Sequence, residues 1–166
     1  MSLDGFIADS EGGYAWIPMD TEIDFGAFTS KIDTLLMGRR TYEVLAGADG
    51  PDGFPGMAKY VVSSTLDPAE HPDVVVLSGD VPAAVQELKE EEGQDIWLFG
   101  GGVLFRSLLE AGLVDRVEVG VIPAVVGAGV PFLPGSSGVA KLTLHSCEEF
   151  ASGIVLLKYD VEQGGT

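Results

Sequence analysis

The stretch Ile96-Trp97-Leu98-Phe99-Gly100-Gly101-Gly102 is an apolar run that ends in three glycines. The helical pattern Val103–Ala111 follows it directly. Such a strand-to-helix turn gathers unblocked backbone N–H groups and the positive end of a helix dipole at one point. Glycine also lets a phosphate approach the backbone closely. The stretch therefore predicts either an anion site suited to phosphate or a tight turn that needs small residues for packing.

Apolar β runs alternate with loops or helix-like segments before this turn, a pattern typical of an α/β fold. Pro82 opens a predicted helix that ends near Glu91, with Val85 and Leu88 on its buried face. Between Tyr42 and Lys59, glycines and prolines are so frequent that we expect a loop, which could act as a mobile flap. The predicted strands of this part are Thr34–Met37, Tyr60–Val62, Val74–Leu77 and Ile96–Phe99.

Longer β segments follow the glycine-rich turn. They cover Val114–Val126, Lys141–Phe150 and Gly153–Val161, and the last two form a predicted antiparallel hairpin around Ala151-Ser152. The tail Glu162–Thr166 should fray. A chain of 166 residues with this pattern is expected to fold as one domain.

The net charge of −17, from 26 acids and 9 bases, argues against nucleic acid or an anionic membrane as partner. The sequence contains neither an apolar run long enough to span a bilayer nor a signal peptide, so we expect a cytoplasmic protein. His71 and His145 have no partner at ligand spacing, which predicts no metal site. Cys147 is interpreted as a packing residue.

A second strand end carries cations. In Met37-Gly38-Arg39-Arg40-Thr41, two guanidiniums and a hydroxyl stand at a predicted helix start, where arginine can bind a phosphate with two parallel hydrogen bonds. The alternative is that both arginines are surface residues and Thr41 only begins the helix. Ser63 and Ser64 follow a third strand and suit ribose or phosphate oxygens, or simply form a turn.

Five motifs follow one another along the chain. They are Ser2-Leu3-Asp4-Gly5-Phe6-Ile7-Ala8, Met37-Gly38-Arg39-Arg40-Thr41-Tyr42, Val62-Ser63-Ser64, Phe99-Gly100-Gly101-Gly102, and Pro123 with Gly127-Ala128-Gly129 and Pro131-Phe132. In this order the motifs resemble those of the dihydrofolate reductase-like superfamily, and in particular the branch with the C-terminal reductase domain of riboflavin biosynthesis enzymes. The resemblance spans nearly the whole chain.

The resemblance implies a single three-layer α/β domain over residues 1–166, with a mostly parallel central sheet, flanking helices and an antiparallel C-terminal strand. It also implies an NADPH-dependent reductase, in which the three glycines receive the pyrophosphate. The predicted helix start at Arg39, Arg40 and Thr41, here called the arginine corner, would hold the adenosine ribose and its 2′-phosphate together with Ser63 and Ser64. The absence of an acid between Met37 and Tyr42 favours NADPH over NADH. The candidate cofactor residues are Gly38, Arg39, Arg40, Thr41, Ser63, Ser64, Gly100, Gly101, Gly102 and Val103.

Hydride transfer also needs a proton donor and a surface for the substrate. Asp24 and Phe28 lie four residues apart on a predicted helix, so a carboxylate could pair with ring nitrogens while the phenyl ring packs on a flat heterocycle. This spacing, with Trp16 upstream, resembles that of dihydrofolate reductases. Thr21-x-x-Asp24 also fits a capping box. Asp4 is either a second catalytic and substrate-binding candidate on the nicotinamide side or a turn former before Gly5.

Two departures from the family pattern bear on the substrate and the fold. Phe99 precedes the glycines where riboflavin-type reductases commonly carry a glutamate, and no second cationic cluster is evident for a ribose phosphate. Family members also place a central β-strand before the Ser-Leu-Asp-Gly motif, whereas here Met1 directly precedes Ser2. We therefore expect that strand to be missing, either through truncation or because the true start lies upstream, which would leave its neighbours without ladder partners.

Three functions remain open from the sequence. The first is NADPH-dependent reduction of a small pteridine- or pyrimidine-like heterocycle. The second is reduction of 5-amino-6-(5-phosphoribosylamino)uracil in riboflavin biosynthesis, and the third is a non-catalytic NADP-binding module. A homodimer is expected, because dimers are common in this branch and the C-terminal strands are long and apolar.

Overall fold

The computed structural model describes residues 1–48, 54–135 and 138–162. The chain divides into two compact units, one formed by Met1–Asp24 with Leu108–Thr166 and the other by Phe25–Ser107. Among the described residues, no helix has the length and apolar character needed to cross a membrane.

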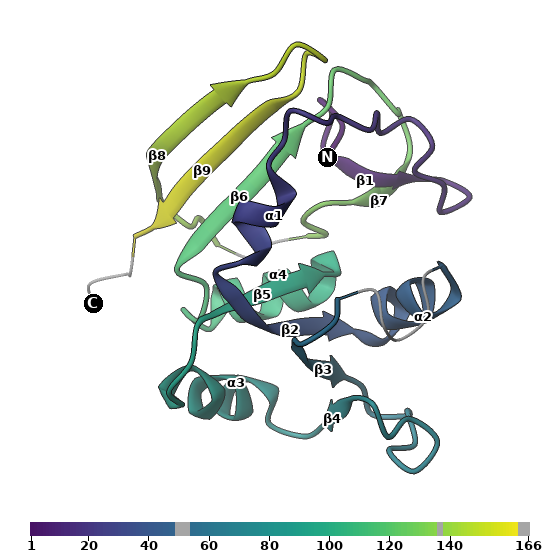
Figure 1. Ribbon diagram of the computed structural model, residues 1–166, viewed down its shortest axis with the longest axis vertical. Helices are drawn as coiled ribbons and strands as arrows, with labels where there is room; N and C mark the ends of the chain where they lie inside the picture. Colours follow the sequence, from purple (N-terminus) through teal and green to yellow (C-terminus); the bar gives the residue numbers. More distant parts are fainter. Residues whose placement is uncertain (49–53, 136–137, 163–166) are drawn as a thin grey trace. The chain divides into compact units, whose positions relative to one another are not determined.

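The unit Phe25–Ser107 contains a four-stranded parallel sheet of order β4-β3-β2-β5 (Figure 1). The four strands confirm the predicted apolar runs. In chain order the elements are α1 (Phe25–Thr29), β2 (Ile32–Gly38), α2 (Arg39–Ala48), β3 (Ala58–Val62), β4 (Val75–Leu77), α3 (Val81–Glu90), β5 (Asp95–Gly100) and the start of α4 (Gly102–Glu110).

The core of this unit forms around β2, whose residues are buried on both faces, as expected for the middle of a parallel sheet. Leu35 and Met37 are fully buried and pack with Val61 of β3. Tyr42 and Leu45 of α2 join them. Since β2 runs directly into α2, this packing fixes the position of Gly38 and of the first residues of α2.

The predicted loop between Tyr42 and Lys59 is wrong in its first part, because α2 continues to Ala48. Tyr42 and Leu45, three residues apart, bury one face of the helix, and this packing outweighs the helix-breaking tendency of Gly47. Phe54 also packs on the core. Residues 49–53 of the predicted flap lie outside the described residues.

The predicted helix at Pro82 is confirmed as α3. Asp80 caps it, with its carboxylate accepting a hydrogen bond of 3.2 Å from the Ala83 N–H. Val85 is buried, as the spacing predicts, and the helix ends at Glu90.

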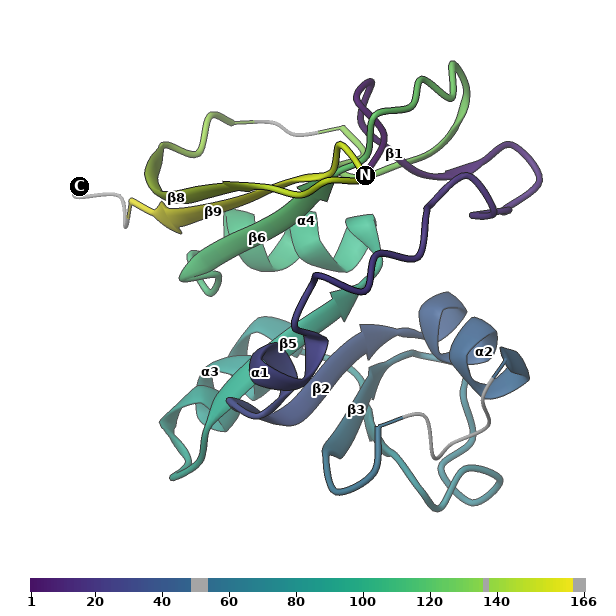
Figure 2. The same ribbon diagram turned by 45° about the horizontal axis from the view of Figure 1, so that its top comes forward.

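The other unit contains an antiparallel sheet of order β6-β9-β8 (Figure 2) and a two-stranded ladder of β1 with β7. The predicted hairpin is confirmed by the pairing of β8 with β9. The homodimer expected from the long apolar C-terminal strands stays a prediction. The strands are β1 (Phe6–Asp9), β6 (Arg116–Val121), β7 (Gly129–Pro131), β8 (Leu142–Glu149) and β9 (Val155–Val161).

The predicted strand Val114–Val126 is too long, since β6 ends at Val121. Pro123 has no N–H to donate to a ladder. The N–H groups of Val126 and Gly127 donate instead to the carboxylate of Asp4. The Asp4 carboxylate thus takes the place of a neighbouring strand as the hydrogen-bond acceptor for residues 126 and 127.

The first residues of the chain lie beside the end of β6. The Met1 amino group donates to the Gly120 carbonyl at 2.6 Å, and the Ile122 N–H donates to the Met1 carbonyl at 2.8 Å. Ser2 then forms a parallel bridge with Ile122. Of the strands in the described ranges, only β2 pairs with β5.

Candidate dinucleotide site

The two glycine-bounded strand ends lie next to each other. β2 and β5 are parallel neighbours, with Met37 opposite Gly100. A Cβ added to Gly38 would lie 3.8 Å from the Gly101 nitrogen and 3.9 Å from the Gly100 oxygen. The two motifs that were separate in the sequence therefore meet at one edge of the sheet.

Gly100 has a backbone conformation that other residues rarely adopt, with φ of +145°. The peptide bond between Gly100 and Gly101 is cis. A Cβ on either glycine would lie 3.4 Å from the Thr41 hydroxyl. Thr41 of α2 thus borders the glycine turn, as expected if both helix starts contribute to one site.

Helix α4 begins at Gly102, directly after the turn, and is nine residues long. The first N–H groups of a helix have no intrahelical acceptor, and the helix dipole places partial positive charge there. Val103, the second helical residue, is 64% exposed. The geometry fits a negatively charged oxygen close to the backbone of residues 100–103.

The arginine corner borders a cavity of about 400 Å³. Arg39, Ser63, Ser64, Thr65, Ser78 and Gly79 line it together with apolar residues. Arg40 is exposed, as is Ser64. The cavity therefore combines a guanidinium with several hydroxyls, which are the groups expected around a phosphorylated ribose.

Ser63 lies at the carboxyl end of β3 and is buried. Its hydroxyl oxygen accepts hydrogen bonds from the N–H groups of Thr65 and Leu66, at 3.1 and 3.0 Å. It therefore shapes the turn after β3, and the hydroxyl hydrogen remains for one further bond. Both interpretations of this serine, turn former and ligand residue, are compatible with that geometry.

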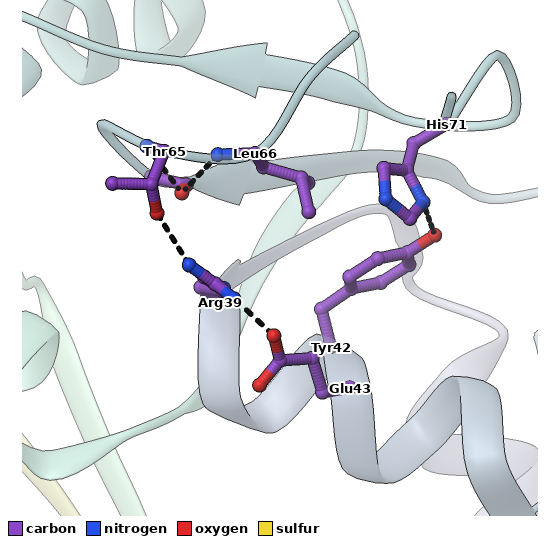
Figure 3. Close-up of polar contacts among 7 residues, drawn as sticks. Arg39, Tyr42, Glu43, Thr65, Leu66 and His71 are labelled. Carbon is purple, nitrogen blue, oxygen red and sulfur yellow. Dashed lines mark hydrogen bonds and ion pairs between the residues drawn. The ribbon is translucent and has the colours of Figure 1, made fainter. Parts of the chain in front are cut away.

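A clasp between α2 and the loop after β3 was not predicted from the sequence (Figure 3). The Tyr42 hydroxyl and the His71 Nδ1 are 2.9 Å apart, and the two rings meet edge to face. The residues are 29 positions apart, so no local spacing signals the pair. Its effect is to hold the loop with Ser63, Ser64 and Thr65 beside the start of α2.

An aromatic cluster around Trp97 was also missed. The Trp97 ring centroid lies 4.8 Å from those of Phe28 and Phe99, 5.5 Å from that of Phe54 and 5.8 Å from that of Phe25. Trp97 and Phe99 are two residues apart on β5 and therefore share a face, which was the available signal. The cluster leads directly to Gly100, and Phe25 at its edge is 49% exposed.

Asp24 comes immediately before α1, and Phe28 lies within that helix. The alternative of a capping box that begins at Thr21 is wrong, because the helix begins at Phe25 rather than after Thr21. Asp24 is exposed, whereas Phe28 is half-buried against Trp97. The roles predicted for these two residues stay predictions.

Asp4 links the N-terminal segment of its unit to the segment that follows β6. Its carboxylate accepts hydrogen bonds from the Ser2 hydroxyl at 2.7 Å, the Val126 N–H at 3.1 Å and the Gly127 N–H at 2.7 Å. These bonds, that of Ser2 first, lower the pKa of Asp4 from 3.8 to about 2. The Asp4 carboxylate is thus engaged in holding residues 126 and 127 beside Ser2, and its catalytic role stays a prediction.

Trp16 lies in the segment between β1 and α1, and its indole N–H donates to the Gly13 carbonyl at 3.3 Å. The same segment is attached to the turn between β8 and β9. The Ser152 hydroxyl donates to the Asp20 carboxylate, and the Ala151 N–H donates to Glu22 at 3.4 Å. The Ser152 bond is the main cause of a lowered Asp20 pKa.

Among the residues that the structure describes, no group of three or more His, Cys, Asp or Glu side chains could hold a metal ion. His145 Nδ1 lies 3.2 Å from the Asp160 carboxylate. His71 is engaged with Tyr42.

Known proteins resemble this chain in sequence and in structure. The chain is 29% identical over 170 residues to the uncharacterized protein YyaP of Bacillus subtilis strain 168, covering 96% of this chain and 90% of YyaP. A putative riboflavin biosynthesis protein from Shewanella sp. PV-4 has a similar structure, with a TM-score of 0.82 and 24% identity over 97% of this chain and 94% of that one.

Dihydrofolate reductase from Enterococcus faecalis is also similar in structure, with a TM-score of 0.66 and 17% identity over 97% of this chain and 92% of that one. The resemblance to the dihydrofolate reductase-like superfamily is thereby confirmed at the level of the fold. Residues 1–156 match the family model of the RibD C-terminal domain. The chain belongs to the RibD C-terminal domain family.

Proposed function

We propose that this protein is an NADPH-dependent reductase of a small pteridine- or pyrimidine-like heterocycle. The observation that carries the proposal is the adjacency of Gly38 to Gly100 and Gly101, with Thr41 beside both of the latter. This arrangement gives one sheet edge a bare backbone anion site and a cationic, hydroxyl-lined cavity, which suit the two phosphate-bearing parts of NADPH.

In this proposal the pyrophosphate lies against Gly100, Gly101 and Gly102 and the Val103 N–H. None of these three glycines carries a Cβ that would stand between the ligand and the backbone. The adenosine ribose and its 2′-phosphate are assigned to the cavity lined by Arg39, Ser63 and Ser64. Arg40 adds positive charge at the same helix start, and Thr41 adds a hydroxyl.

Bound NADPH would supply the hydride. The chain's residues would have to position the substrate, exclude water and provide a proton. Asp24 is the proposed proton donor and the partner of ring N–H groups, while Phe28 and Trp16 would pack on a flat ring. Asp4 is proposed to shape the loop at Val126 and Gly127 rather than to transfer a proton, because three hydrogen bonds already engage its carboxylate.

The aromatic cluster supports a flat and weakly charged substrate. Phe99 directly precedes Gly100, and its ring packs against those of Trp97 and Phe54, with centroids 4.8 and 5.4 Å away. These rings also pack against the core. Phe25 at the edge of the cluster is 49% exposed and would offer a heterocycle an apolar surface for stacking rather than a cation for a phosphate ester.

Reduction of 5-amino-6-(5-phosphoribosylamino)uracil is the second candidate, because the family model is that of a riboflavin-pathway domain. A phosphoribosyl substrate needs cations beyond those assigned to the cofactor. Arg116 and Lys158 are engaged with Asp160 and Glu118 in ion pairs. We therefore place this reaction second.

The proposal is tested by calorimetric titration of the full chain with NADPH and with NADH. We expect NADPH to bind more tightly, and Arg39→Gln to weaken NADPH binding by about tenfold to a hundredfold, because charge-assisted hydrogen bonds are lost. Arg116→Gln, which removes an arginine from β6, is the matched control and should bind NADPH as the wild type does. Absence of NADPH binding by the wild type would overturn the proposal.

Turnover then separates the remaining candidates. NADPH absorbance is followed in the presence of pterins, pyrimidines and the phosphoribosylamino-uracil. Oxidation with an uncharged heterocycle supports the first candidate, and oxidation with the phosphorylated compound alone supports the second. Tight NADPH binding without turnover of any of these compounds would favour a non-catalytic NADP-binding module.

A further inference from the structure

The Arg39 side chain is held at two points before any ligand is considered. Its Nε–H donates to the Glu43 carboxylate at 2.7 Å, and its Nη1 donates to the Thr65 hydroxyl (Figure 3). Glu43 lies one turn later on α2, while Thr65 belongs to the loop after β3. The guanidinium thus bridges the two elements that border the cavity.

Two contacts do not use all the donors of an arginine. A guanidinium carries five N–H groups in one plane, and only the Nε–H and one N–H of Nη1 are engaged by Glu43 and Thr65. The other three belong to Nη1 and Nη2. With the plane fixed at Nε and Nη1, the remaining N–H groups of Nη1 and Nη2 are held in set directions and can donate to phosphate oxygens.

Stability alone gives little reason for the Arg39–Glu43 pair. The two side chains are 47% and 49% exposed, and half-exposed ion pairs of this kind add little to folding stability. The pair does restrict a long side chain with many rotamers. Restriction before binding reduces the entropy that the ligand would otherwise have to overcome.

We propose that Glu43 is a positioning residue of the cofactor site, which orients Arg39 and thereby increases the discrimination between a phosphorylated and an unphosphorylated adenosine ribose. The inference rests on the proposed function, since it concerns the same cavity. Glu43 itself need not touch the cofactor, because its carboxylate is engaged with the Nε of Arg39.

An opposite effect of Glu43 must be separated from this one. A carboxylate near a phosphate also repels it, although solvent and salt screen the repulsion at a half-exposed position. Glu43→Gln removes the charge but keeps an oxygen that can accept from Nε. Glu43→Ala removes both. The two effects therefore predict different results for this pair of variants.

The test compares the ratio of the NADH and NADPH dissociation constants in the full chain. Positioning predicts that Glu43→Ala lowers this ratio about threefold to tenfold, the range expected for one side chain that must be ordered on binding. Glu43→Gln should stay within about twofold of the wild type. Glu87→Ala, at an exposed glutamate of α3, is the control for loss of one acidic charge.

A second readout follows Arg39 without any cofactor. In ¹H–¹⁵N spectra the Nε–H of Arg39 should exchange slowly with water in the wild type and in Glu43→Gln, and quickly in Glu43→Ala. An unchanged ratio and unchanged exchange in Glu43→Ala would overturn the inference, as would tighter NADPH binding by both Glu43 variants. A wild type that does not prefer NADPH would instead overturn the proposed function, and the inference with it.

Discussion

The hydroxyl of Tyr42 lies 2.9 Å from Nδ1 of His71 and joins the first turn of α2 to the loop between β3 and β4. Tyr42 is only 7% exposed, and its hydrogen bond with His71 is partly buried. A buried hydroxyl without a partner is costly, which makes this hydrogen bond more important than a surface one.

The first prediction concerns this clasp. Tyr42→Phe and His71→Ala should each reduce the free energy of unfolding, and a double-mutant cycle should give a coupling energy of about 0.5–1.5 kcal/mol. Urea unfolding of the four proteins measures it. Strictly additive losses would mean that the two side chains do not interact.

The second prediction concerns the backbone anion site. Gly101→Ala should fold normally, because the added methyl group would be in ordinary contact with Thr41 at 3.4 Å and Gly101 does not have a positive φ. NADPH affinity should fall by about tenfold or more, since the methyl group keeps phosphate oxygens from the N–H groups.

Gly47→Ala in α2 is the control for this variant, since a Cβ there meets no atom within 4 Å. It should leave NADPH affinity unchanged and raise stability by about 0.5–1 kcal/mol, because alanine is the better helix former. Calorimetry and thermal unfolding measure both quantities. Equal affinity of Gly101→Ala and wild type would contradict the assignment of the pyrophosphate to this turn.

The third prediction concerns Asp4 and acid. Because folding lowers the Asp4 pKa from 3.8 to about 2, its contribution to stability is complete above about pH 4 and is lost as the pH falls towards about 2. Asp4→Asn should therefore be less stable than the wild type at neutral pH and should lose less further stability between about pH 4 and pH 2.

Urea midpoints across this pH range give the comparison, with the exposed Glu11→Gln of the same unit as control. A parallel pH dependence of Asp4→Asn and wild type would show that the hydrogen bonds from Ser2, Val126 and Gly127 do not govern the Asp4 carboxyl group.

The fourth prediction concerns the proton donor. With a heterocycle that the wild type reduces, Asp24→Asn should lower kcat by about a hundredfold or more, because general acid catalysis is lost. The dissociation constant of NADPH should not change. Stopped-flow kinetics and calorimetry separate the two quantities, and an unchanged kcat would assign the proton to another group.

The sequence predicted the elements with strong local signals well. The runs that became β2, β3, β4 and β5 are short and apolar, and Pro82 marked the start of α3. Helix α2 was cut short because glycines and prolines dominate the residues after it, while tertiary packing of Tyr42 and Leu45 extends it to Ala48. Strand β6 was overextended because an apolar pattern does not show where ladder partners end.

The site was only partly predictable for a related reason. Glycine and arginine motifs at strand ends are local signals, so Gly38, Arg39 and Gly100 could be proposed as site residues from the sequence. Their adjacency follows from the order of strands, which places β2 beside β5. Pairs such as Tyr42 with His71, or Trp97 with Phe54, depend on contacts between distant segments and leave no periodic pattern in the sequence.

All residues of the proposed dinucleotide site, from Gly38 to Val103, fall within the unit Phe25–Ser107. A ligand bound there would stabilise that unit against local unfolding, because binding raises the free energy of opening for the elements that the ligand touches. Amide hydrogens of β2, α2 and β5 should consequently gain far more protection from deuterium exchange than those of the β6-β9-β8 sheet.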